Sequence, residues 1–233
     1  MHEIYSQARR VIVWLGDPTS ETDLAMQYIR NVHAPVEKGK EDQISDVVAL
    51  KNWPLRFLST APLSLTDIAS LVAFYKFLRQ PWWYRAWIVQ EMGLARALNM
   101  QCGKEIVTFS QVKAALQITR RIHPAFILYT DVVKRSIAED PSLEADWPSD
   151  AINNALNLEY CRRMILERDA RTASNGHPSA EQVSWSFWST RARLCKMPHD
   201  RAFSLLGIAG KDFRKSFASR YEDAPEEHYR NTV

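Results

Sequence analysis

A short apolar run, Val11 to Leu15, constrains the fold of this chain more than any other feature. The run is rich in β-branched residues and ends at Gly16-Asp17-Pro18, a turn signal. Such a run is typical of a strand that is buried on both faces inside an α/β sheet. A single strand is not stable, because its backbone groups need hydrogen-bond partners on both sides. No second strand is convincing in the first 95 residues, so we expect sheet neighbours from elsewhere.

Helical periodicity dominates most of the remaining chain. Ser20 with Asp23 and Thr108 with Gln111 form capping-box patterns at two of the predicted helix starts. The predicted helices cover residues 2–9, 20–33, 42–51, 64–78, 108–122, 124–137, 150–168 and 180–194. An aromatic turn enters a further helix within 82–95, and residues 98–101 and 105–107 are predicted to be short strands around Gly103-Lys104. The fold class is therefore α/β, with a predominantly helical C-terminal part.

Charge and hydropathy exclude several functional classes. The 30 Lys and Arg residues are scattered among 27 Asp and Glu residues, so no basic face is expected and no nucleic-acid partner is predicted. No apolar run approaches the ~20 residues that span a bilayer, so no membrane span is predicted. Three widely spaced cysteines and the absence of a secretory leader indicate a reducing, cytoplasmic compartment.

Three segments together carry a resemblance to a known family. The first runs from Met1 to Ala8 and leads into the sequence VIVWLGD, and the second runs from Pro81 to Glu91. The third runs from Asp200 to Gly207. In this order and spacing they resemble the fungal heterokaryon incompatibility (HET) domain, and the Pro81–Glu91 segment is the most specific of the three.

The resemblance implies a cytoplasmic module for non-self recognition and programmed cell death in fungi, a form of innate immunity. Such a module is expected to act through protein partners or self-association. Residues 1–123 would form a partial domain core, 124–212 its helical C-terminal part and 213–233 a charged tail. The family's upstream strands do not occur before Met1, so we expect an N-terminally truncated domain whose missing strands would flank Val11–Leu15. An inert truncated fragment remains an alternative.

HET domains are also thought to be distant relatives of Toll/interleukin-1 receptor-like (TIR) domains, which have a flavodoxin-like parallel sheet. The spacing Trp87-x-x-x-Glu91 resembles the TIR helix in which a glutamate is catalytic in NAD-cleaving members. The resemblance therefore implies a partial parallel sheet, NAD as a candidate substrate and no certain cofactor. Glu91 would be the catalytic carboxylate, which stabilises an oxocarbenium-like ribose. The predicted substrate-binding residues are Trp82, Trp83, Trp87, Arg85, Gly16 and Asp17, the last two at the carboxyl end of the predicted strand.

A structural interpretation of the same residues is favoured for this chain. The tryptophans would be core residues, and Arg85 would pair with Glu91 or Glu3 as a brace, because a partly buried charge usually needs a partner. Cys195 and His199 have a metal-like spacing, but no second pair completes a zinc site, so no metal is predicted. We expect Cys195 to be buried and His199 to lie on the surface.

Overall fold

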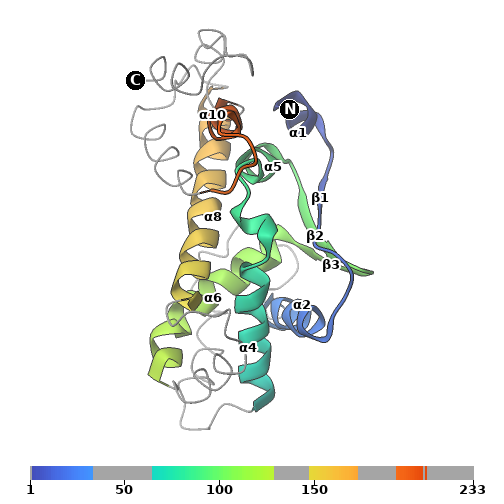
Figure 1. Cartoon of the computed structure of the whole chain (residues 1–233), viewed down its shortest axis with the longest axis vertical. Helices are drawn as coiled ribbons and strands as arrows, with labels where there is room; N and C mark the ends of the chain where they lie inside the picture. The colour runs from blue at the N-terminus through green and yellow to red at the C-terminus, as the bar shows by residue number, and fades with distance from the viewer. Residues whose placement is uncertain (1, 34–64, 129–146, 173–192, 207, 209–233) are drawn as a thin grey trace. The chain divides into compact units, whose positions relative to one another are not determined.

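The computed structural model describes residues 2–33, 65–128, 147–172, 193–206 and 208 (Figure 1). The elements in chain order are α1 (His2–Gln7), β1 (Val11–Trp14), α2 (Ser20–His33), α4 (Leu65–Leu78), η2 (Pro81–Tyr84), α5 (Ile88–Leu94), β2 (Leu98–Cys102), β3 (Glu105–Thr108), α6 (Phe109–Leu128), α8 (Trp147–Thr172) and α10 (His199–Leu206). The predicted α/β class with a helical C-terminal part is confirmed. The predicted helix 42–51 lies outside the described residues, as do 129–137 and most of 180–194.

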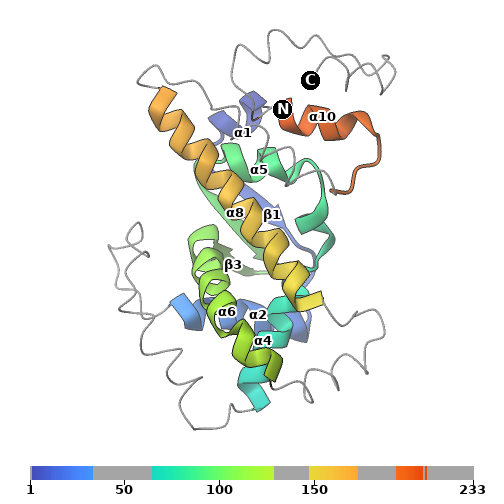
Figure 2. The same ribbon diagram turned by 90° about the vertical axis from the view of Figure 1, so that its left-hand side faces the viewer.

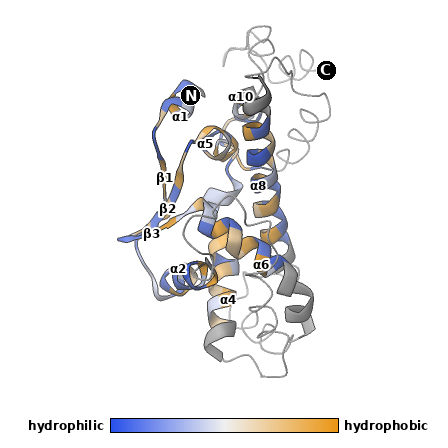
Figure 3. Ribbon diagram, turned by 180° about the vertical axis from the view of Figure 1, so that it is seen from behind, coloured by the Kyte–Doolittle hydropathy of each residue, from blue (hydrophilic) through white to orange (hydrophobic). Residues whose placement is uncertain are grey.

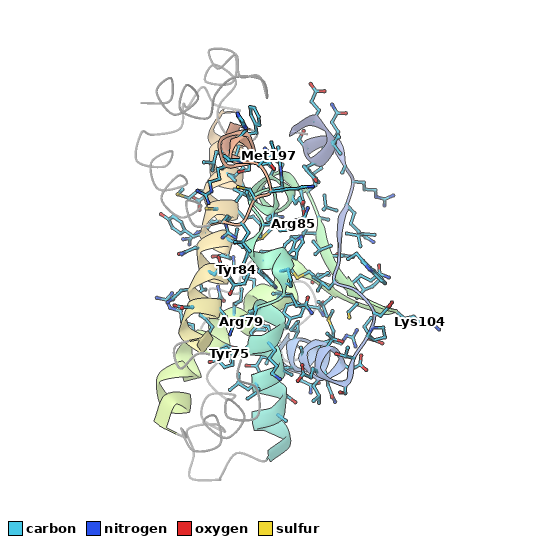
Figure 4. The ribbon with its side chains drawn as sticks, viewed as in Figure 1. Tyr75, Arg79, Tyr84, Arg85, Lys104 and Met197 are labelled. Atoms are coloured by element: carbon cyan, nitrogen blue, oxygen red, sulfur yellow. The ribbon has the colours of Figure 1, made fainter. Side chains whose placement is uncertain are left out.

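The sheet has three strands in the order β1-β2-β3 and is mixed. β1 runs parallel to β2, because the amide of Val11 donates to Ala97 O at 2.8 Å and that of Leu15 donates to Gln101 O at 2.9 Å. β3 is antiparallel to β2 and forms with it the predicted hairpin, whose tip carries Lys104 (Figure 4). The predicted parallel pairing therefore holds for β1 and β2 only.

Strand β1 is buried on one face only, and the expectation of burial on both faces was wrong. Val13 is 2% exposed, whereas Ile12 and Trp14 are 57% and 56% exposed. Helices α2 and α6 pack against β3. On that strand Val107 is buried and Ile106 is exposed, so these helices cover one face of the sheet. In the described part of the chain, no helix covers the opposite face of the sheet. The apolar sequence from Val11 to Leu15 therefore did not mean that both faces of the strand are buried.

The chain forms two compact units, each assembled from separate stretches of sequence. The first contains residues 1–11, 81–98 and 157–233, and the second contains 12–80 and 99–156. The predicted boundaries at 123 and 212 stay predictions.

Helices α2, α4 and α6 form the core of the second unit (Figure 2). The rings of Tyr28 and Phe74 have centroids 5.1 Å apart, and Phe74 stacks on Phe77 at 6.0 Å. The buried hydroxyl of Tyr28 lies 2.9 Å from Thr119 Oγ1 and thereby joins α2 to α6. Helix α4 contributes apolar residues along most of its length (Figure 3), which is typical of a buried helix.

The N-terminal caps of α6 and α2 can be compared with the predicted capping patterns. Thr108 and Gln111 form the predicted capping box, in which the Thr108 amide donates to Gln111 Oε1 at 2.8 Å. The cap of α2 lies one residue earlier than predicted, at Thr19, whose Oγ1 accepts the amide of Thr22 at 3.2 Å. Ser20 is already the first helical residue.

We expect alkaline pH to destabilise the second unit through its buried tyrosines. Burial raises the pKa of Tyr75 well above its ordinary value of 10.0, and the nearby Tyr28 adds to this increase. A raised pKa in the folded state gives stability that is complete below pH 10 and is lost as the pH rises further. The free energy of unfolding should therefore fall by up to about 1.4 kcal/mol per pH unit for this group. Denaturant unfolding at pH 8 to 11 measures this slope, and Tyr75→Phe should show a smaller one. Equal slopes would contradict the assignment.

Gly103 in the β2–β3 turn should not tolerate a side chain. Its φ is +54°, and a Cβ placed there would lie 2.7 Å from Cδ of Pro18. Gly103→Ala is therefore expected to lower the free energy of unfolding by about 1–2 kcal/mol, the cost of the left-handed conformation for an L-residue. Urea unfolding measures the change. Lys104→Ala, at the exposed neighbouring position, should have little effect, and equal losses in the two variants would refute the argument.

Candidate functional site around helix α5

Helix α5 is the buried centre of the first unit. All of its seven residues except Glu91 are buried, and Figure 3 shows the helix as largely hydrophobic. A helix this short is marginal by itself, so its stability must come from the elements packed around it. Within this unit, α1, η2 and α10 all pack against α5.

The carboxylate of Glu91 interacts with two segments that precede it. Trp82 in η2 donates from Nε1 to Glu91 Oε2 at 3.0 Å. Tyr5 in α1 lies near the same side chain and interacts with it electrostatically. Burial raises the pKa of Tyr5, the negative charge of Glu91 raises it further, and the positive charge of Arg85 partly opposes this. Glu91 therefore joins η2 to α5 by a hydrogen bond, and its charge also interacts with Tyr5 of α1.

The neighbouring Gln90 connects α5 to α10. Its side chain is 1% exposed, and Nε2 donates to the backbone oxygen of Phe203 at 2.7 Å. The ring of Phe203 in turn stacks on His199, with centroids 6.2 Å apart. Gln90 thus connects the Pro81–Glu91 segment to the segment that begins at Asp200. Its neighbour Glu91 connects the same segment to the N-terminal segment that contains Tyr5.

The strand-like segment at Arg193 and Leu194 covers the turn that enters α5. Leu194 pairs with the chain at Arg85, since its amide donates to Tyr84 O at 2.7 Å and its oxygen accepts the amide of Ala86 at 2.9 Å. Arg193 is almost fully buried and donates to the backbone oxygen of Trp83 at 2.6 Å. Burial lowers the pKa of Arg193 to about 10, so the guanidinium stays charged at neutral pH. No sequence motif marked Arg193.

The C-terminal end of α5 is capped by α8. Arg162 donates to the backbone oxygens of Met92 and Ala95, the latter at 2.9 Å. These carbonyls have no helical partner at a helix end, and a guanidinium also complements the negative end of the helix dipole. Gly93 allows α8 to approach, because a Cβ there would lie 2.3 Å from Cδ1 of Ile165.

The predicted site residues are only partly brought together. Trp82 and Trp83 are buried and pack edge to face, with centroids 5.1 Å apart, as the core interpretation expects. Trp87 is half-buried and immediately precedes α5. Arg85 is exposed (Figure 4), and the ion pairs among the described residues, Arg30–Glu105 and Lys76–Glu21, do not include it.

Gly16 and Asp17 belong to the second unit, whereas Glu91 belongs to the first. Gly16 has a φ of +101°, and the backbone oxygen of Asp17 accepts a contact from Cys102 Sγ at 3.5 Å. The catalytic and substrate-binding roles of these residues stay predictions.

Two further observations concern metals and membranes. Cys195 is half-buried and His199 is buried, so the expected burial of this pair was wrong, because His199 packs on Phe203. Among the described residues, no three His, Cys, Asp or Glu side chains gather closely enough to hold a metal ion. None of the described helices combines the length and apolarity needed to cross a bilayer.

The part of the chain that matches a known protein family ends at Glu91. The family model for the heterokaryon incompatibility protein (HET) matches residues 1–91. Residues 1–91, here called the HET segment, are thus similar to the HET family. Tyr5 lies near the start of this HET segment, and Trp82 and Glu91 lie at its end, so the two ends of the segment meet at one carboxylate.

A curated relative supports the same family. The chain is similar to heterokaryon incompatibility protein 6, OR allele, of Neurospora crassa, at 26% identity over 139 residues. The aligned stretch covers 52% of this chain and 20% of the relative. No solved structure matches the chain.

Proposed function

We propose that this chain is a HET-domain module of fungal heterokaryon incompatibility, which acts in the cytoplasm in non-self recognition and cell-death signalling. The match of residues 1–91 to the HET family carries the proposal. The geometry supports a binding module rather than a catalyst. Glu91 is engaged by Trp82 and Tyr5, and its neighbour Gln90 by the backbone of Phe203. The residues of the most specific segment thus hold a framework together, and such a framework can present surfaces to protein partners.

Expression in fungal cells tests this proposal. The chain is fused to a domain that forces oligomerisation, and viability is compared with that of cells expressing the oligomeriser alone. We expect loss of viability. A matched fusion with Trp83→Ala, which removes a core side chain of the same unit, should be less toxic at equal protein level. Full viability with the intact fusion, under conditions in which a full-length relative kills, would reject the proposal for this chain.

A second proposal is NAD cleavage with Glu91 as the catalytic carboxylate. It is supported by the partial exposure of Glu91, in contrast to the other residues of α5, and by the half-buried Trp87 one turn away. Purified protein is incubated with NAD, and released nicotinamide is measured. Activity that disappears in Glu91→Gln while the fold is retained would support this proposal. Activity that persists in Glu91→Ala would remove Glu91 from the role.

The inert-fragment alternative predicts a negative result in both experiments. A folded protein that neither harms cells when oligomerised nor releases nicotinamide would favour it. Cell death without NAD cleavage would instead favour the binding module.

A further inference from the structure

Two exposed arginines lie side by side where the chain enters the parallel strands β1 and β2. Arg9 lies two residues before β1, and Arg96 lies two residues before β2. The strands run next to each other (Figure 1), and the amide of Val11 donates to Ala97 O at 2.8 Å. In a parallel pair an amide bonds to the residue that precedes its neighbour on the other strand. Continued by two residues, this register makes Arg96 the neighbour of Arg9, with the two backbones about 5 Å apart.

No acidic side chain among the described residues forms an ion pair with either arginine, because the two ion pairs found there involve other side chains. No aspartate or glutamate occurs in residues 4–16 or 92–104, the stretches that contain both arginines and both strands. Glu91, the acidic residue that precedes Arg96 most closely in the sequence, accepts the hydrogen bond of Trp82 instead. Like charges side by side on neighbouring strands are destabilising, so this arrangement favours a bound anion.

A third guanidinium lies behind the turn that carries Arg96. Arg162 in α8 donates to Ala95 O at 2.9 Å and also to Met92 O. This contact holds the residue before Arg96 in place and adds a positive charge beside the same turn. The negative charge of Glu159 acts on Arg162 and offsets part of that charge. The backbone under Arg96 is therefore fixed before any ligand arrives, and such preorganisation lowers the cost of binding.

We propose that Arg9 and Arg96 form a binding site for a phosphate dianion, with Arg162 as a supporting charge. A planar guanidinium donates parallel hydrogen bonds to two phosphate oxygens. Two such groups on neighbouring strands can hold one dianion between them, and the dianion neutralises both charges. A carboxylate carries a single charge and would leave one arginine uncompensated. The site lies at the N-terminal end of β1, whereas the predicted substrate-binding residues Gly16 and Asp17 follow its C-terminal end.

Nuclear magnetic resonance of the isotope-labelled full chain tests this inference. Inorganic phosphate is titrated at constant ionic strength and about pH 7.5, where the dianion predominates. The Nε–H signals of the two arginines, assigned from their loss in Arg9→Gln and Arg96→Gln, should shift together with a Kd of about 1–10 mM. Each variant should weaken binding by about threefold to tenfold, because one of two charge-assisted contacts is lost. Methyl phosphate, titrated separately, distinguishes the two sources of the dianion. An equal Kd indicates a phosphate ester, and a weaker one indicates free phosphate.

Arg10→Gln is the matched control, because it removes the same charge from the next residue, and successive side chains along a strand point to opposite faces. It should weaken binding by less than about twofold. Without phosphate, Arg9→Gln should resist urea at least as well as the unmodified protein, because it separates two like charges. The inference would be overturned by unchanged signals up to about 20 mM phosphate, by equal weakening in Arg10→Gln and Arg9→Gln, or by a loss of stability in phosphate-free Arg9→Gln. Phosphate binding is measured without cells or NAD, so the result is independent of both proposed functions.

Discussion

Trp83→Ala is expected to lower the free energy of unfolding of the first unit by about 3–5 kcal/mol, the usual cost of deleting a fully buried aromatic side chain. Trp83 has no exposed surface and packs edge to face on Trp82. Its backbone oxygen also accepts the buried guanidinium of Arg193 at 2.6 Å. A cavity at this position would loosen the turn that enters α5 and the segment that covers it.

Equilibrium urea unfolding followed by circular dichroism measures this loss. Hydrogen exchange by mass spectrometry assigns it to the first unit. Trp87→Ala is the matched control, because it removes the same type of side chain at a half-buried position four residues later. It should cost clearly less. Equal losses in the two variants would mean that Trp83 is not a core residue.

Arg162→Met is expected to lower the free energy of unfolding by about 2–4 kcal/mol, because it leaves the carbonyls of Met92 and Ala95 without their donor. Methionine keeps most of the aliphatic stem, so packing changes little. Burial lowers the pKa of Arg162, which shows that the charged group already carries a desolvation cost. Removing the charge also removes this desolvation cost, and this limits the decrease in the free energy of unfolding.

Arg163→Met provides the comparison in the same denaturation experiment. The Arg163 guanidinium lies 5.0 Å from the ring centroid of Tyr160 and is exposed, so its removal should cost about 0.5–1 kcal/mol. A loss for Arg162→Met no larger than this would show that the end of α5 does not depend on α8.

Local patterns in the sequence predicted most of the described elements, because caps and turns act over a few residues. The Thr108–Gln111 capping box and the hairpin at Gly103-Lys104 are both confirmed. The exposure of Ile12 and Trp14 on the second face of β1 could not be predicted from the sequence. An apolar run shows that a strand has apolar residues on both faces, but not whether other elements cover them.

The contacts around α5 were predictable only in part. The segment Pro81–Glu91 identified Trp82 and Glu91, and the helical spacing placed Glu91 one turn after Trp87. Tyr5, Arg162 and Arg193 were missed as partners of this segment. The two arginines donate to backbone oxygens, which every residue has, so no residue pattern marks the acceptors. Tyr5 approaches Glu91 only because the chain folds back over more than 80 residues.

A double-mutant cycle between Tyr5→Phe and Glu91→Leu tests most directly whether Glu91 fastens α1 to α5. Phenylalanine removes only the hydroxyl group, and leucine removes the carboxylate. Urea unfolding of the two single variants, the double variant and the unmodified protein gives the coupling energy. We predict a coupling above about 0.5 kcal/mol, because the Tyr5 hydroxyl and the Glu91 carboxylate interact. Additivity within about 0.5 kcal/mol would contradict the account of Glu91 as the carboxylate that joins the two ends of the HET segment.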